Sequence, residues 1–315
     1  MRVLITGGAG FIGSEMVRRL ANSKYETTVI DSLTYAGNLE SLAQVRNQIK
    51  FLKIDIRDSI NLKHLFEEQR FDAVVNFAAE THVDNSISSP EIFLETNILG
   101  TFNLLELARK HEFKFLQVST DEVYGSIRDG EFVESDKLDP SSPYSASKAS
   151  AELLMQAYIK TYAIPALGVR CSNNYGHYQH FEKLIPAFIG RIINRSKVPV
   201  YGDGSNVREW IHVSDSVIGI LKVLELGQVG QFYNISSGDF HSNLEVARRI
   251  IEHFGGGNDS IEFVKDRPGH DFRYAISSSK IRSELGWEPK VDFAKGLSRT
   301  IKWYEDNPKY LSGRK

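Results

Sequence analysis

Hydrophobic and polar positions follow two alternating patterns up to about residue 170. Short apolar runs rich in β-branched residues alternate with longer segments in which apolar residues recur every three or four positions. The first pattern predicts buried strands and the second predicts amphipathic helices. Such an alternation is typical of a parallel sheet covered on both faces. We predict strands at 3–6, 28–30, 51–54, 73–77, 115–119 and 166–170, and helices at 11–22, 62–69, 92–110 and 145–162.

After residue 170 the pattern becomes less regular, and short strands separate predicted helices at 184–194, 215–226, 244–254 and 293–306. Ser242 and Glu245 have the spacing of a capping box, which indicates a helix start. We therefore predict a doubly wound Rossmann-type α/β domain over 1–170 and a smaller C-terminal α/β lobe over 171–315. The boundary is soft, because chains of this kind cross back and forth between lobes.

Composition excludes several classes of protein. The 315 residues carry a net charge of −2, so no basic excess indicates a nucleic-acid partner. No apolar run approaches the ~20 residues of a membrane span, and the chain opens on a predicted strand with no leader visible. The nine His residues form no ligand-like cluster, so we expect no metal. The single Cys171 allows no intrachain disulfide and fits a reducing, cytoplasmic location.

A glycine-rich turn joins the first predicted strand to the first helix. Gly7, Gly10 and Gly13 have the spacing G-x-x-G-x-x-G. Glycine permits a tight turn and lets a pyrophosphate approach the backbone at a helix N-terminus. Asp31 ends the second strand, where a carboxylate binds a ribose 2′-hydroxyl and repels a 2′-phosphate. A glycine turn alone can simply connect two elements, but the combination predicts an NAD site.

Residues at two further strand ends border the same predicted site. Asp55 and Ile56 follow the third strand and could flank the adenine, although a solvated strand end is an equal alternative. Phe77, Ala78 and Ala79 close the fourth strand. Their small side chains would let the backbone lie against the cofactor, or could equally serve helix packing.

Tyr144 and Lys148 lie four residues apart, on one face of a predicted helix. An ammonium near a phenol lowers the phenol pKa, which would create a base for a sugar hydroxyl while hydride leaves for NAD. Ser119 or Thr120, at the end of the fifth strand, can add a hydroxyl hydrogen bond. Such a pair alone is usually a surface pair, and the glycine turn upstream favours the catalytic interpretation.

Asp121 and Glu122 are adjacent carboxylates at the same edge of the sheet, where open parallel sheets bind ligands. Two carboxyl groups in one cleft can split their pKa values, so that one acts as acid and the other as base. A solvated acidic loop would be the default interpretation without Tyr144 and the glycine turn.

In these residues the chain resembles the dTDP-glucose 4,6-dehydratase family of the extended short-chain dehydrogenases, over nearly its whole length. The most specific match is 119–125 together with 144–148, because sugar 4-epimerases share the Tyr and Lys but usually lack the Asp-Glu pair. Other matching segments are 33–39, 78–84, 171–176, 182–186, 207–210 and 267–271.

The resemblance implies dehydration of a nucleotide-activated glucose, with dTDP-glucose favoured, to its 4-keto-6-deoxy sugar. Tyr144, with Thr120 and Lys148, takes the 4-hydroxyl proton as hydride passes from C4 to NAD. Glu122 removes the C5 proton while Asp121 protonates the departing 6-hydroxyl. Hydride then returns to C6, so NAD stays tightly bound and is regenerated in each turnover.

The resemblance also implies two sets of binding residues, the first mainly in the domain over 1–170 and the second mainly in the C-terminal lobe. The cofactor set is Gly7, Gly10, Phe11, Ile12, Gly13, Asp31, Ser32, Thr34, Asp55, Ile56, Phe77, Ala78, Ala79, Thr96, Ser119, Tyr144, Lys148 and Asn174. The substrate set is Thr81, Thr120, Asn173, Lys183, Leu184, Pro199, Tyr201, Arg208, Asn243, Arg267 and His270.

One segment departs from the family pattern. The family usually has Pro-Tyr-Gln after Tyr-Gly, and a second proline before Glu-Lys, whereas residues 177–181 here are His-Tyr-Gln-His-Phe. Losing both prolines should loosen a loop that borders the predicted nucleotide pocket, so the nucleotide and the sugar stay open. His177 and His180 could bind phosphate or act in catalysis, but solvent-facing side chains are the default.

The helices at 92–110 and 145–162 carry apolar residues at helical spacing. In the resembling family such helices pair across a dimer as a four-helix bundle, so we expect a homodimer unless both faces pack on their own sheet. Alternative functions are a sugar-nucleotide 4-epimerase or decarboxylase of the same fold. From another class, a catalytically silent NAD-binding sensor would not need the Tyr-Lys pair.

Overall fold

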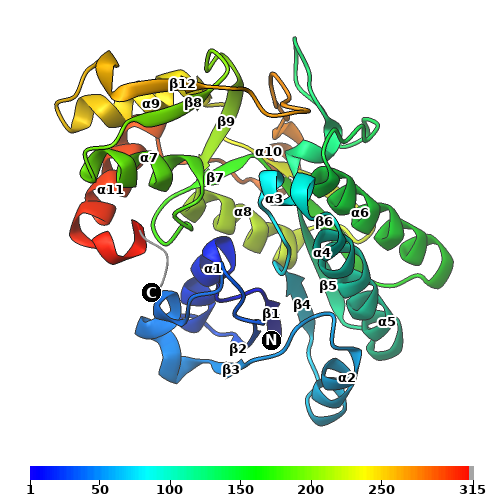
Figure 1. Cartoon of the computed structure of the whole chain (residues 1–315). Coiled ribbons are helices and arrows are strands. Elements are labelled where there is room, and N and C mark those ends of the chain that lie inside the picture. Colours follow the sequence, from blue (N-terminus) through cyan, green and yellow to red (C-terminus); the bar gives the residue numbers. More distant parts are fainter. Residues whose placement is uncertain (312–315) are drawn as a thin grey trace.

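A parallel sheet of seven strands forms the centre of the computed structural model, which describes residues 1–311 (Figure 1). The strand order is β10-β6-β5-β4-β1-β2-β3, so the order reverses between β1 and β4. Ligands bind at such a reversal in doubly wound sheets, and the predicted fold class is confirmed. The strands are β1 (Arg2–Thr6), β2 (Glu26–Ile30), β3 (Lys50–Leu52), β4 (Ala73–Asn76), β5 (Lys114–Thr120), β6 (Ala166–Cys171) and β10 (Phe232–Ile235).

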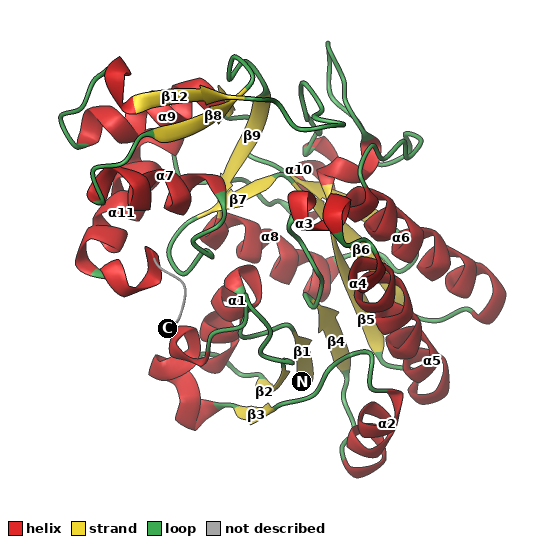
Figure 2. Ribbon diagram, viewed as in Figure 1, coloured by secondary structure: helices red, strands yellow, loops and turns green. Residues whose placement is uncertain are grey.

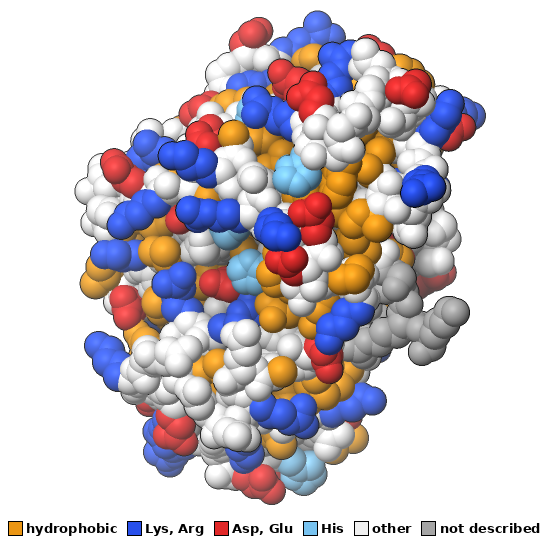
Figure 3. Space-filling model, turned by 90° about the vertical axis from the view of Figure 1, so that its left-hand side faces the viewer, with side chains coloured by type: hydrophobic (Ala, Val, Ile, Leu, Met, Phe, Trp, Pro, Cys, Tyr) orange, Lys and Arg blue, Asp and Glu red, His pale blue; other side chains and the backbone are white. Residues whose placement is uncertain are grey.

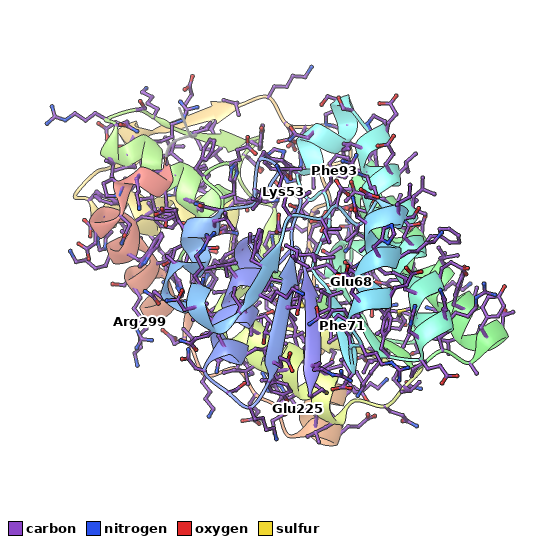
Figure 4. The ribbon with its side chains drawn as sticks, turned by 90° about the horizontal axis from the view of Figure 1, so that it is seen from below. Lys53, Glu68, Phe71, Phe93, Glu225 and Arg299 are labelled. Carbon is purple, nitrogen blue, oxygen red and sulfur yellow. The ribbon has the colours of Figure 1, made fainter. Side chains whose placement is uncertain are left out.

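Helices cover both faces of this sheet, and each face has its own apolar core (Figure 2). One core joins the strands to α1 (Phe11–Ala21), the 3₁₀ helix η1 (Leu39–Gln48) and α8 (Val213–Leu226). The other joins them to α2 (Ser59–Glu68), α5 (Thr101–His111) and α6 (Pro143–Tyr162). Phe71 of the second core lies beside the strands in the view from below (Figure 4).

The helix predicted over 92–110 is interrupted by a wider turn. It consists of α4 (Glu91–Phe93), the π-helical segment η2 (Leu94–Gly100) and α5, and the short α3 (Val83–Ser88) precedes it. Gly100 lets this segment approach the loop after β3, because a Cβ there would lie 2.5 Å from the Ile56 side chain. The sequence pattern did not indicate the π turn, which frequently marks a functional site.

The C-terminal lobe packs three helices against two small sheets. The helices are α7 (Leu184–Ile193), α9 (Asn243–His253) and α11 (Phe293–Asp306). One sheet pairs β8 (Val198–Tyr201) with β12 (Ile261–Val264), and the other contains β7 (Asn173–Tyr175), β9 (Val207–His212) and β11 (Phe240–Ser242). The short elements are η3 (Asp121–Tyr124), η4 (Asn258–Ser260), α10 (Ser279–Leu285) and η5 (Pro308–Leu311).

Two features of the second half bear on the sequence predictions. The capping box is confirmed, because the Glu245 amide donates to Ser242 Oγ (3.1 Å) and the Ser242 amide donates to Glu245 Oε2 (2.8 Å). The chain also crosses between lobes, since β10 pairs with β6 and α8 covers the large sheet. Residues beyond 170 therefore complete the sheet, and the functional division at that residue stays a prediction.

The surface and the described helices carry no sign of a membrane segment or a metal cluster. Within residues 1–311, no helix is long and apolar enough to cross a membrane. No group of three or more His, Cys, Asp or Glu side chains in that range could hold a metal ion. On the face shown in Figure 3, acidic and basic side chains are interspersed.

Candidate active site

A cavity lies at the carboxyl ends of β1, β4, β5 and β6, where the strand order reverses. Every residue of the predicted cofactor set lines it, and so do all five predicted catalytic residues. Thr81, Asn173 and Lys183 of the substrate set line it as well. The fold therefore brings together residues from nine separate segments of the sequence, between Gly7 and Lys183.

The glycine turn forms a cradle that only glycine can build. Gly7 has a φ of +63°, and a Cβ there would lie 2.6 Å from the Ala78 amide nitrogen. A Cβ on Gly13 would lie 2.3 Å from the Gly7 carbonyl oxygen. Gly10 caps α1 without a side-chain hydrogen bond, and the first turn has no acidic residue. The helix N-terminus is therefore available to an anion such as a pyrophosphate.

Asp31 is held in place by the cradle itself. Its Oδ2 accepts a hydrogen bond from the Ala9 amide (2.9 Å), and its Oδ1 accepts one from the Leu33 amide (2.8 Å). Burial nevertheless raises the carboxyl pKa, against the lowering effect of these two donors. Each carboxylate oxygen retains a second lone pair. The geometry thus fits a carboxylate that accepts from ribose hydroxyls, as NAD binding requires.

Buried polar atoms without a hydrogen-bond partner gather along the cavity wall. Because native structures satisfy most buried polar groups, such atoms indicate positions that a bound molecule completes. Only some of these atoms belong to residues of the predicted cofactor and substrate sets. Two of the others belong to Ser172 and Gln179, which sequence reasoning did not assign to either set. The atoms are Ser119 Oγ, Asp121 Oδ2, Ser172 Oγ, Asn173 Oδ1, Asn174 Oδ1 and Gln179 Oε1.

Tyr144 stands in the first turn of α6, behind the N-cap Ser142. Lys148 lies one turn further and donates from Nζ to the Val118 carbonyl oxygen (2.7 Å). Burial lowers the pKa of Lys148 to about 8. Burial and the Glu122 carboxylate raise the pKa of Tyr144 well above its ordinary value, while a hydrogen bond with Thr120 lowers it. The expectation that Lys148 gives the phenol a low pKa is therefore wrong for the protein by itself.

Asp121 and Glu122 form the turn η3, which Thr120 begins. Thr120 Oγ1 accepts from the Glu122 amide (3.3 Å) and donates to Asp121 Oδ1 (3.1 Å). Asp121 is buried, and its pKa is raised well above the ordinary value by burial, by Glu122 and by Glu209. Burial also raises the pKa of Glu122, but the cations Arg208, Arg267 and Lys183 oppose that rise. The two carboxyl groups are thus unequal, with Asp121 holding its proton more firmly.

Comparisons with known proteins agree with this geometry. A family described as GDP-mannose 4,6 dehydratase matches residues 4–300. The low-salt glycan biosynthesis protein Agl12 of Haloferax volcanii is 50% identical over 96% of this chain and 98% of its own length. The dTDP-glucose 4,6-dehydratase of Streptomyces niveus is 46% identical over 98% of this chain and 94% of its own.

A solved structure extends the likeness to three dimensions. DesIV, a dTDP-glucose 4,6-dehydratase from Streptomyces venezuelae solved with NAD and dTDP bound, has a TM-score of 0.95 and 46% identity, with 99% of both chains covered. This chain belongs to the dTDP-glucose 4,6-dehydratase family. The resemblance drawn from its motifs is confirmed.

Part of the substrate set lies outside the dehydratase cavity. Arg208 is buried, and its guanidinium donates to the carbonyl oxygens of Asp271 (2.9 Å) and Val207 (2.8 Å). Arg267 pairs with Asp84 (3.5 Å), and His270 Nδ1 lies 2.6 Å from Asp266 Oδ1. The set members that do not line the cavity are Leu184, Pro199, Tyr201, Arg208, Asn243, Arg267 and His270.

The loop at 177–181, which departs from the family pattern by lacking two prolines, packs against neighbouring helices and the cavity. The Tyr178 ring packs against Trp303 (4.7 Å between centroids) and beneath the Arg18 guanidinium (4.6 Å). His177 Nε2 lies 3.4 Å from Glu15 Oε2. His180 lines the cavity, so its expected solvent-facing position is wrong. Aromatic and ionic contacts therefore hold the first part of the loop, at His177 and Tyr178, against α1 and α11.

Asn97 does not line the cavity but supports one of its loops, and sequence reasoning missed it. It is buried in η2, where its Nδ2 donates to Ser147 Oγ (2.8 Å) and to the Glu80 carbonyl (3.1 Å), and its Oδ1 accepts from the Glu80 amide (2.9 Å). These bonds hold the cavity loop at Glu80 against the catalytic helix α6. No sequence signal marked it, because an amide inside a helical pattern has no distinctive spacing.

We predict that Gly13→Ala weakens NAD binding by roughly two orders of magnitude or more, because the new Cβ forces the cradle backbone apart. Isothermal titration with NAD measures the loss. Gly190→Ala, in α7, is the matched control, since its Cβ would meet only Leu311, at ordinary contact distances of 3.5 Å or more. Unchanged NAD affinity in the Gly13 variant would show that the cradle is not the binding site.

Proposed function

We propose that this chain is an NAD-dependent dTDP-glucose 4,6-dehydratase whose product is the 4-keto-6-deoxy sugar nucleotide. The observation that carries the proposal is that Asp121 and Glu122 share one cavity with Tyr144, Lys148 and the glycine cradle. Epimerisation at C4 needs the redox residues but no acid–base pair for elimination. The unequal carboxyl groups supply that pair.

The redox half of the reaction uses the phenol and its neighbours. When bound, NAD supplies the hydride acceptor for C4 oxidation, the hydride donor for reduction at C6, and a positive ring charge in its oxidised form. Tyr144 takes the 4-hydroxyl proton, and Thr120 hydrogen-bonds to the phenol oxygen. Burial raises the pKa of the Tyr144 phenol, so a nearby positive charge is needed to stabilise the phenolate. We assign that role to the Lys148 ammonium, four residues further along α6.

The elimination half uses the two carboxyl groups. Oxidation at C4 acidifies the C5 proton, which the Glu122 carboxylate removes. Asp121, whose proton burial retains, donates it to the 6-hydroxyl, and water leaves. After hydride reaches C6, Glu122 returns its proton to C5. Lys183 is half-buried and donates to the Thr81 carbonyl (2.8 Å), and its positive charge favours the ionised form of Glu122.

The nucleotide would lie toward the C-terminal lobe. Arg267, paired with Asp84 at the substrate side, and Asn243, whose Oδ1 is buried without a partner, are its proposed contacts. A guanidinium presents a fork of donors to a diphosphate. We favour dTDP because DesIV, which matches this chain over 99% of both lengths, was solved with that nucleotide. The single buried Cys171 supports a reducing, cytoplasmic location.

A homodimer is the proposed assembly. Helices α5 and α6 lie side by side, joined by the hydrogen bond from Tyr158 Oη to Glu106 Oε1 (2.6 Å). Their surface, with that of η2, exposes large apolar side chains, among them Leu99 (56% exposed) and Leu153 (56% exposed). Exposed apolar patches on adjacent helices are typical of protein interfaces. Two helices from each copy would form a four-helix bundle.

The substrate assay tests the proposed reaction. We expect incubation with dTDP-glucose to give a product lighter by one water, without net consumption of added NAD, in mass spectrometry. UDP-glucose and UDP-N-acetylglucosamine serve as parallel substrates, and the expected turnover with either is lower. Recovery of a C4 epimer with no change in mass would contradict the dehydratase assignment.

The Glu122→Gln variant tests the assigned base. We expect C4 oxidation to survive, because Tyr144, Lys148 and the cradle are unchanged. Exchange of the C5 proton with deuterated water and loss of water should fall by roughly two to four orders of magnitude. NADH absorbance follows the first step and mass spectrometry follows the others. Elimination at the wild-type rate would show that another residue is the base.

Light scattering tests the dimer. We expect twice the chain mass for the wild type and the monomer mass for Leu153→Arg, because a buried charge opposes the bundle. Leu226→Arg changes a leucine of similar exposure (59%) on α8, away from the bundle, and should stay dimeric. A monomeric wild type would overturn the proposed assembly.

A further inference from the structure

A buried ion pair joins Glu152, one helical turn after Lys148 on α6, to Arg170 on β6. The Glu152 and Arg170 side chains are 0% and 2% exposed, and Glu152 Oε2 accepts from Arg170 Nε (3.0 Å) and Nη2 (2.7 Å). Such a pair is costly to bury, and matched apolar residues often stabilise a fold as well or better. Its place in the structure indicates a role other than stability.

The pair connects three elements that carry the chemistry. Glu152 follows Tyr144 and Lys148 at the same four-residue spacing, so all three share one face of α6. Arg170 lies on β6 in register with Ser119, at the end of the catalytic strand β5. The ion pair therefore fixes the catalytic helix against the two strands that hold the active-site loops.

Arg170 also reaches the turn that contains the two carboxyl groups. Its Nη1 donates to Tyr124 Oη (2.5 Å), and its guanidinium lies over the Tyr124 ring (4.6 Å). Tyr124 ends η3, three residues after Asp121, and donates in turn to Asn234 Oδ1 (3.0 Å). These hydrogen bonds connect α6, β6 and η3 through buried side chains, while Glu152 Oε1 is buried without a hydrogen-bond partner.

We propose that Glu152 and Arg170 are positioning residues of the dehydratase, which hold α6 and the Asp121–Tyr124 turn in register and keep Lys148 in its ammonium form through the Glu152 carboxylate. The catalytic part of this proposal rests on the proposed function. The electrostatic part concerns the protein alone.

The charge on Lys148 depends on few neighbours. Burial lowers its pKa to about 8, and the Glu152 carboxylate on the same helix opposes that decrease. Cys171 on β6 also faces Lys148, but burial raises the pKa of its thiol to about 12, so it is neutral at working pH. Without the Glu152 charge, the pKa of Lys148 should fall further, and the ammonium should be lost at lower pH.

Titration of Lys148 by NMR in protein labelled with ¹³C at lysine Cε tests this directly. The Lys148 signal is identified by its absence in Lys148→Arg. We expect its midpoint to fall by roughly one pH unit or more in Glu152→Gln. With dTDP-glucose, the alkaline limb of the kcat profile should move down by the same amount, with KM changed less than about twofold.

A second variant keeps the test valid if an unpaired Arg170 prevents folding. Glu152→Gln combined with Arg170→Met removes both charges. We expect a folded protein whose Lys148 midpoint still falls, but by less than in Glu152→Gln, because no unpaired Arg170 cation remains. Tyr124→Phe retains the ion pair and should leave that midpoint unchanged while lowering the rate of water loss. Glu68→Gln is the control for a Glu-to-Gln change at an exposed position, at the end of α2. It should change neither the Lys148 midpoint nor the rate of water loss.

Two results would overturn the proposal. An unchanged Lys148 midpoint in both Glu152 variants would remove the electrostatic role. A shifted midpoint with an unchanged kcat profile would remove the positioning role in catalysis. The NMR measurement uses no substrate, so absence of dehydration in the wild type would contradict the proposed function without affecting the Lys148 result.

Discussion

The close approach of the glycine turn to the end of β4 constrains the rest of the site. Gly7 can lie against Ala78, and Gly13 against Gly7, only because neither glycine has a Cβ. This packing points the N-terminus of α1 into the cavity and places the amides of Ala9 and Leu33 on Asp31. A larger residue at either glycine would move the helix, the carboxylate and the cofactor site together.

Burial sets the electrostatic character of the catalytic residues more than any single charge pair does. It raises the pKa of Tyr144 and Asp121 and lowers that of Lys148, in each case by disfavouring the charged form. Neighbouring groups then separate residues that are chemically alike. Arg208, Arg267 and Lys183 lower the pKa of Glu122 against the effect of burial, while Glu122 and Glu209 add to the effect of burial in raising the pKa of Asp121. Two adjacent carboxyl groups can thus serve as base and acid in one turnover.

The C-terminal half contributes to the site in two ways. Its β10 and α8 complete the sheet, and its loop at 177–181 closes onto α1. Contacts of Tyr178 with Trp303 and Arg18 hold that loop without the family's prolines. The loop places His180 on the cavity wall, so its contribution to sugar or nucleotide selection depends on packing against helices distant in sequence.

The sequence by itself determined the doubly wound fold, because the alternation of apolar patterns depends on local spacing. It also predicted the cofactor and catalytic residues, from local motifs and from the family resemblance. The structure brings these residues into one cavity, and their individual roles stay predictions. Three local motifs carried the site prediction in combination. They are glycines three apart after a strand, a Tyr and a Lys one helical turn apart, and two carboxylates at a strand end. The tertiary structure alone decided what depends on contacts between distant segments. These include the raised pKa of Tyr144, the position of Arg208 against backbone carbonyls, the role of Asn97 and the Glu152–Arg170 pair. Burial and long-range hydrogen bonds produce all four, and a linear pattern of residue types does not encode either.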